Sequence, residues 1–74
     1  MKISALDWWR EHKNSPGMDG SSKRALIQVL RGWLEDDDRI RAEMTPDVIE
    51  KEWEPVFGQD RKDVLAAIAE MEAV

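Results

Sequence analysis

Cysteine is absent from the 74-residue chain, and histidine occurs once, as His12. The lack of cysteine excludes a disulfide framework, a thiolate zinc site and a cysteine nucleophile, and it fits a reducing cytoplasm. A single histidine has no second histidine with which to share a metal or a proton. A long apolar run is also missing near the N-terminus, because Asp7 interrupts it before a signal-peptide core or a membrane span could form. We therefore expect a cytoplasmic protein without a membrane segment.

Sequence patterns that carry catalysis are missing as well. Ser15, Ser21 and Ser22 lie in an expected loop and at an expected helix start, with no nucleophile-elbow sequence around them. Residues 17–20 read Gly-Met-Asp-Gly, and the aspartate would repel a phosphate group. The acidic run over residues 35–38 lacks the alternating ligands and the turn glycine of a calcium loop. We expect no enzymatic activity, no metal, no cofactor and no small-molecule substrate.

The length and the charge distribution bound what remains. Seventy-four residues form one domain over residues 1–74, whose core supplies only a few kcal/mol of net stability. The net charge is −5, but residues 1–34 carry +3 and residues 35–74 carry −8. Solvated helix faces would explain this division, and so would one surface that binds anions beside another that binds cations.

Apolar spacing and capping signals predict an all-α fold, a compact bundle of four to five short helices, because no segment shows the sustained alternation of a strand. Ser4 and Asp7 form a capping pattern that starts a first helix, which runs to about Lys13. Residues 14–17, Asn-Ser-Pro-Gly, predict a loop. A second helix, capped by Ser21 or Ser22, is expected to end near Leu34 and carries one apolar stripe: Leu26, Ile27, Leu30, Trp33 and Leu34.

The second half of the chain predicts three further helices. An aspartate of the acidic run should cap a short helix that carries Ile40 and Met44. Thr45 followed by Pro46 is a clear start signal for the next helix, and Pro55 is expected to end it. Asp60 should cap the last helix, whose apolar stripe consists of Val64, Leu65, Ile68 and Met71.

Tryptophan is unusually frequent: Trp8, Trp9, Trp33 and Trp53 are four of the five aromatic residues. All four could build the core with their indole N–H groups at its rim. Alternatively, one or two of them anchor a protein interface, since tryptophan is enriched at binding hot spots. Trp8 and Trp9 point about 100° apart on a helix, so if one of them enters the core, the other lies at its edge or outside it. The interface candidates are Trp9, Trp33 and Trp53.

Basic residues in the first half suggest a nucleic-acid contact. Arg24 and Arg31 lie seven residues apart and hence nearly on one helix face, where cations could neutralise phosphates. The chain as a whole is acidic, so contact within a larger complex is expected rather than free-standing binding. The candidate nucleic-acid-binding residues are Arg10, Lys13, Lys23, Arg24 and Arg31.

The segments Leu6-Asp7-Trp8-Trp9-Arg10 and Lys23-Arg24-Ala25-Leu26-Ile27, separated by a glycine-bearing loop, resemble the N-terminal part of the CasB family, the small subunit of type I-E CRISPR Cascade complexes. Thr45-Pro46-Asp47-Val48, Val56-Phe57 and an alanine-rich last helix follow in a similar order. The resemblance implies an all-helical, non-enzymatic subunit that packs on other proteins and contacts RNA or DNA through basic residues. The chain departs from the family at Gln28 and Val29, where the family tends to place an arginine pair.

Two functions follow as hypotheses. The first is a non-enzymatic helical subunit that docks on a larger nucleic-acid-handling assembly through a protein partner. The alternative is a phage-type acidic inhibitor, anti-CRISPR-like or a DNA mimic, whose functional surface would be the carboxylates of residues 35–63. A helix-turn-helix regulator over residues 37–54 is disfavoured, because its acidic side chains would repel phosphates.

Overall fold

The computed structural model describes residues 3–73, and these residues form three helical stretches without a strand. The first is α1 (Ala5–His12), and the second is α2 (Gly20–Ala42). The third runs without a break through α3 (Pro46–Val48), the π-helical segment η1 (Ile49–Gly58) and α4 (Gln59–Glu72). The all-α prediction is confirmed, whereas the prediction of four to five short helices is not.

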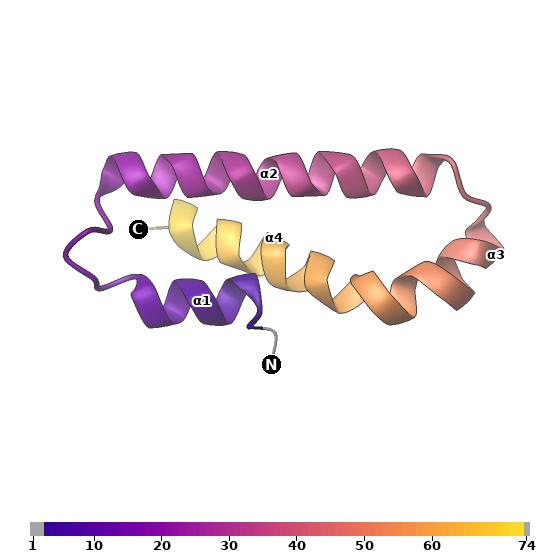
Figure 1. Cartoon of the computed structure of the whole chain (residues 1–74), viewed down its shortest axis with the longest axis horizontal. Helices are drawn as coiled ribbons and strands as arrows, with labels where there is room; N and C mark the ends of the chain where they lie inside the picture. The colour runs from indigo at the N-terminus through magenta and orange to yellow at the C-terminus, as the bar shows by residue number, and fades with distance from the viewer. Residues whose placement is uncertain (1–2, 74) are drawn as a thin grey trace.

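The molecule is elongated, with principal extents of 44 × 23 × 19 Å. Helix α2 runs along its length, and the third stretch turns back beside it, so that the end of α4 lies towards the start of α2 (Figure 1). Helix α4 packs against both α1 and α2. No helix within residues 3–73 offers a stretch that is long and apolar enough to cross a membrane.

Two of the predicted helix starts are confirmed by their caps. Ser4 Oγ accepts a hydrogen bond of 3.1 Å from the Asp7 backbone N–H at the start of α1. Thr45 Oγ1 accepts one of 3.3 Å from the Val48 backbone N–H, with Pro46 in the first turn of α3.

The predicted start of the second helix, with Ser21 or Ser22 as the cap, is wrong by two or three residues. Asp19 caps α2, and its carboxylate accepts from the Ser22 backbone N–H at 2.8 Å. The pKa of Asp19 is lowered, mainly by the backbone hydrogen bond from Ser22. An ionised carboxylate also suits the positive end of a helix better than a serine hydroxyl does.

Helix α2 does not end at Leu34, and no separate short helix carries Ile40 and Met44. No glycine or proline follows Gly32 before the helix ends at Ala42, so nothing in the backbone stops it. The acidic residues expected to cap a new helix lie inside α2. Two of them pair with arginines one turn later, Asp36 with Arg39 and Asp37 with Arg41.

Pro55 does not end its helix, and Asp60 does not cap a new one. The chain passes Pro55 as η1, in which hydrogen bonds of the π type widen the turn. A wider turn relieves the clash between a proline ring and the carbonyl group one turn back. The backbone at Gly58 is already helical, with φ −60° and ψ −43°, so α4 begins without an interruption.

The buried core lies where α1 meets α4. Trp9, Ala67 and Met71 are buried in one cluster, and partly buried side chains of α2 pack on it, among them Leu26, Ile27 and Leu30. Val64 and Ile68 are also buried and continue the inner face of α4. Of the apolar stripe predicted for the last helix, Leu65 alone is exposed.

Candidate functional site

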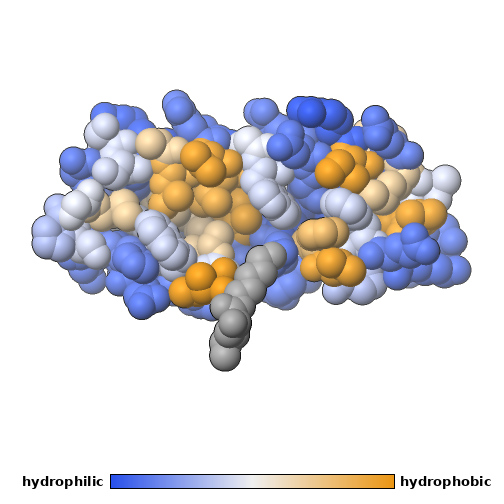
Figure 2. All heavy atoms as spheres, in the orientation of Figure 1, coloured by the Kyte–Doolittle hydropathy of each residue, from blue (hydrophilic) through white to orange (hydrophobic). Residues whose placement is uncertain are grey.

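An open apolar furrow runs along α2, where the neighbouring helices leave one side of it partly uncovered. It consists of three adjoining hollows of about 290, 180 and 310 Å³, which share Leu30 and then Trp33 as common walls. On the face drawn in Figure 2, hydrophobic side chains gather over the first half of α2 and towards α1, with further groups towards the α3 end. We call this surface the furrow. Its apolar lining consists of Ile3, Ala5, Trp8, Leu26, Leu30, Trp33, Ile40, Trp53, Phe57, Val64 and Met71.

Helical spacing explains why these side chains share one side of the molecule. Leu26, Leu30 and Trp33 follow at i, i+4 and i+7, so they lie in one row along α2. In η1, the rings of Trp53 and Phe57 pack together with their centres 4.2 Å apart. The furrow therefore has a helical wall on one side and an aromatic wall at its far end.

The structure separates the four tryptophans into buried and partly exposed rings. Trp9 is 3% exposed and belongs to the core, so the interface role predicted for Trp9 does not fit its burial. Trp8 lies at the edge of the core, as the 100° rotation between neighbouring residues requires, and its ring stacks on His12 with centres 4.4 Å apart. Trp33 and Trp53 are partly exposed and line the furrow, which keeps both as interface candidates.

The predicted basic residues are only partly brought together. Lys13 and Lys23 line one hollow of about 360 Å³ near the α1–α2 loop, beside Glu70. Arg10 pairs with Glu70 at 2.8 Å, and hydrogen bonds from the guanidinium lower the pKa of that carboxyl. Arg31 pairs with Glu72 at 2.9 Å. Arg24 is exposed on α2. The carboxylates of α4 therefore balance the positive charge of Arg10 and Arg31.

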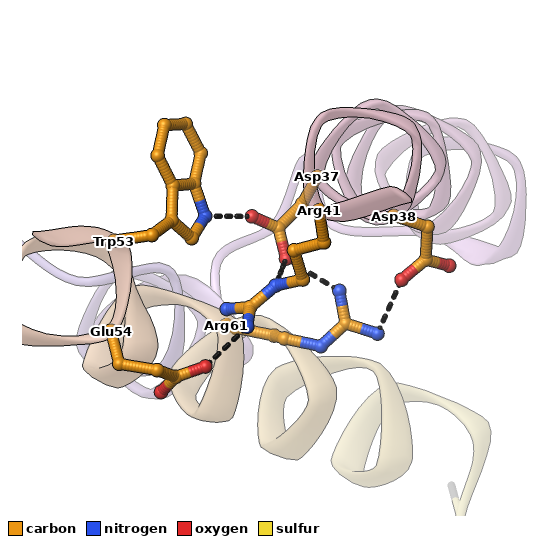
Figure 3. A network of polar contacts seen from close by, with 6 residues as sticks. All are labelled: Asp37, Asp38, Arg41, Trp53, Glu54 and Arg61. Atoms are coloured by element: carbon orange, nitrogen blue, oxygen red, sulfur yellow. Dashed lines mark hydrogen bonds and ion pairs between the residues drawn. The ribbon is translucent and has the colours of Figure 1, made fainter. Parts of the chain in front are cut away.

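A charge network around one buried aspartate, which was not predicted from the sequence, stands beside the furrow (Figure 3). Asp37 is 3% exposed, although it belongs to a run of four acidic residues. Its Oδ2 accepts from Arg41 Nε at 2.7 Å and from Arg61 Nη1 at 2.6 Å, and its Oδ1 accepts from Trp53 Nε1 at 2.8 Å. We call Asp37, Asp38, Arg41, Trp53, Glu54 and Arg61 the Asp37 network.

The outer members of the Asp37 network give each arginine a second acidic partner. Arg41 also donates to Glu54, and Arg61 pairs with Asp38 at 2.7 Å. Within residues 3–73, the buried Arg41 Nη2 alone lacks an acceptor among buried side-chain polar atoms. The network thus links α2, η1 and α4 and fixes where the aromatic wall of the furrow stands.

Opposing effects set the pKa of Asp37. Burial raises the pKa of the carboxyl, but hydrogen bonds from Arg41, Trp53 and Arg61 together outweigh burial and hold it below its ordinary value of 3.8. The pKa values of Arg41 and Arg61 are raised, mainly by their hydrogen bonds to Asp37. All three groups therefore carry their full charge at neutral pH, and the network is an ion cluster rather than a proton-transfer site.

One signal in the sequence could have found Asp37. Ile27, Leu30 and Leu34 form an apolar row on α2 with alternating steps of three and four residues, and the next two positions of that row are Asp37 and Arg41. An acid and a base that continue an apolar row at i and i+4 indicate a buried ion pair.

Within residues 3–73, no group of three His, Cys, Asp or Glu side chains could hold a metal ion.

Comparison with known proteins adds no relative: no family model, no curated protein and no solved structure matches the chain.

Proposed function

We propose that the chain is a non-enzymatic helical interaction domain, a subunit that docks on a larger nucleic-acid-handling assembly through the furrow. The observation that carries the proposal is the furrow itself, an apolar surface that follows α2 from Leu26 to Ile40 and contains three partly exposed tryptophans, Trp8, Trp33 and Trp53. An exposed apolar surface of this kind is typical of a binding site.

The placement of charge supports a protein rather than a nucleic acid as the direct partner of the furrow. Arg10 and Arg31 are engaged by glutamates of α4, which lowers the charge that they could offer to phosphates. In the CasB-like interpretation, contact with RNA or DNA then depends on the assembly around the domain, with Arg24 and Lys13 as its exposed contributors.

The docking test uses two substitutions that introduce the same side chain. Ile40→Glu places a carboxylate in the furrow, and Leu65→Glu places one on α4 away from it; the two residues are 37% and 47% exposed. Affinity purification from cells followed by protein identification should recover nucleic-acid-handling proteins with the wild type and with Leu65→Glu, and lose them with Ile40→Glu. Recovery of the same proteins by all three would contradict the proposal.

The acidic-inhibitor alternative is favoured by one observation, the exposed carboxylates around α3 and η1. Replacing Asp47, Glu50 and Glu52 by lysine tests it, since these side chains lie outside the furrow and the Asp37 network. Loss of partner capture in this variant, with Ile40→Glu still active, would favour the inhibitor. Asp37 and Glu54 are unsuitable for this test, because both hold the Asp37 network together.

A further inference from the structure

The segment formed by α3 and η1 lies outside the apolar core. Over residues 46–57 no side chain is buried, and Ile49, Trp53 and Phe57 alone are half-buried. This segment packs on α4, whereas the buried apolar side chains of the described chain all belong to α1 and α4: Trp9, Val64, Ala67, Ile68 and Met71. We call residues 46–58 the lid. Because few buried apolar contacts hold the lid, its local stability depends on other interactions.

Polar contacts join the lid to α2 at two neighbouring side chains (Figure 3). Trp53 Nε1 donates to Asp37 Oδ1 at 2.8 Å, and Glu54 accepts from Arg41. A hydrogen bond to an ionised group is about twice as strong as a neutral one, which favours the bond to Asp37. The Glu54 side chain is 43% exposed, so water weakens its ion pair. The bond from Trp53 to Asp37 is therefore the stronger of the two contacts.

The lid can separate from α2 without leaving a buried charge unpaired. Asp37 keeps Arg41, which lies one turn later in the same helix, and Arg61, which lies in α4. Removing these arginines would be costly, because an unpaired buried charge strongly destabilises a fold. Release of Trp53 and Glu54 instead exposes a neutral indole N–H and a carboxylate that already meets water. Opening therefore breaks the outer contacts and preserves the centre of the Asp37 network.

We propose that the lid opens from α2 as one unit while α1, α2 and α4 stay packed, and that the bond from Trp53 to Asp37 is its latch. The lid moves about residues 43–45 at one end and about Gly58, between η1 and α4, at the other. Closure places Trp53 and Phe57 as the aromatic wall of the furrow, and opening removes that wall. The consequence for docking rests on the proposed function, whereas the lid itself does not.

Native-state hydrogen exchange of the full chain at low urea concentrations tests the lid. The amides of Ile49, Trp53 and Phe57 should share one opening equilibrium with one urea dependence. They should open at least about tenfold more often than the amides of Ala67 and Met71. If both sets open through the same equilibrium, the molecule unfolds only as a whole. If the lid amides exchange without urea dependence, they fluctuate one by one. Either result would overturn the proposal.

Two matched substitutions test the latch. Trp53→Phe keeps an aromatic ring but removes the N–H donor, whereas Trp33→Phe makes the same change across the same hollow, where the indole has no polar partner in the described chain. Trp53→Phe should raise opening of the lid about tenfold, as expected for loss of a hydrogen bond to a charged group, and leave Ala67 and Met71 unchanged. Trp33→Phe should raise it less than about threefold. Equal effects would show that ring volume holds the lid, and would overturn the latch.

The lid and the docking function fail in different experiments. Hydrogen exchange of the isolated chain needs no partner, whereas partner capture with Ile40→Glu tests docking. If the lid opens as one unit but Ile40→Glu captures the same proteins as the wild type, the docking function fails and the lid stands. If every amide exchanges through global unfolding but Ile40→Glu abolishes capture, the lid fails and the docking function stands.

Discussion

The two ends of this elongated molecule are held together by different physical means. At the apolar end, where α1 meets the end of α4, Trp9, Ala67 and Met71 are buried among aliphatic side chains. At the other end, the only buried charged residue of the described chain, Asp37, connects α2, η1 and α4 through hydrogen bonds. Apolar packing is nearly non-directional, whereas the Asp37 network depends on donors that meet one acceptor.

This difference indicates which end of the fold tolerates side-chain substitution. A core of aliphatic side chains accepts a new side chain of similar volume at a cost below about 1.5 kcal/mol. A buried ion cluster does not accept even an isosteric change, because an unpaired charge or donor remains behind.

The largest effect is expected for Asp37→Asn. However the amide is turned, its NH2 group meets either Trp53 Nε1 or the two guanidinium donors, so that a donor faces a donor. We expect the free energy of unfolding to fall by about 3–5 kcal/mol, as when one partner of a buried ion pair is removed. Urea unfolding measures the change, with Asp36→Asn as the exposed control, expected within about 0.5 kcal/mol of the wild type. A loss below 1 kcal/mol for Asp37→Asn would show that the network contributes little.

Met71 gives the matching experiment at the apolar end. Its side chain is 1% exposed, so Met71→Ala should cost about 2–5 kcal/mol through lost burial and the cavity left behind. Met71→Leu conserves volume and should cost less than about 1.5 kcal/mol. The same urea titration checks both, and similar losses for Leu and Ala would mean that this end also requires one particular shape.

A smaller effect is expected in the pH dependence of the unfolding free energy, which further distinguishes the charged end from the apolar end. The pKa of Asp37 is lower in the folded chain than its ordinary value, so its contribution is fully present above about pH 4 and is lost as the pH falls through the folded value. Unfolding free energies measured from about pH 2 to pH 6 should therefore decline more steeply in the wild type than in Asp37→Asn. Parallel curves would show that other carboxylates, such as Glu70, control acid unfolding.

The smallest effect concerns Gly32, in the middle of α2 between the two ends. A Cβ atom built there meets no atom within 4 Å, so Gly32→Ala removes a helix-weakening residue without a clash. We expect a gain of about 0.5–1 kcal/mol in unfolding free energy. Gly58→Ala is the contrasting variant, because its Cβ would displace the Glu54 side chain from beside Gly58 and so disturb its bond to Arg41. Thermal unfolding of the two variants should shift in opposite directions.

Local signals predicted what depends on local chemistry. The all-α class and the starts at Ser4 and Thr45 follow from side chains that bond to the backbone three residues away. The boundaries at Leu34, Pro55 and Asp60 were wrong because no helix breaker follows Gly32 in α2 and because a proline can be accommodated within a π-helical turn. Arg41 and Arg61 keep the acidic run inside a helix by pairing with Asp37, and a widened turn carries the chain past Pro55.

The candidate site was predictable in kind but not in detail. Its tryptophans were recognised, yet composition does not distinguish Trp9, which is buried, from Trp33, which lines the furrow. The choice depends on how α1 is rotated against α4, and that rotation is fixed by contacts some 60 residues apart in the chain, such as Arg10 with Glu70. Asp37 was hidden among like residues, since only its place in the row of Ile27 and Leu34 sets it apart.

The bond from the Trp53 indole to Asp37 provides the protein with an optical reporter of its own. Indole emission shifts to longer wavelength when the ring meets water, and Trp53 and the buried Trp9 lie at opposite ends of the molecule. Opening of the charge network alone would redden part of the spectrum while the emission of Trp9 stays blue. A single unlabelled sample could therefore report whether the two ends come apart together or in sequence.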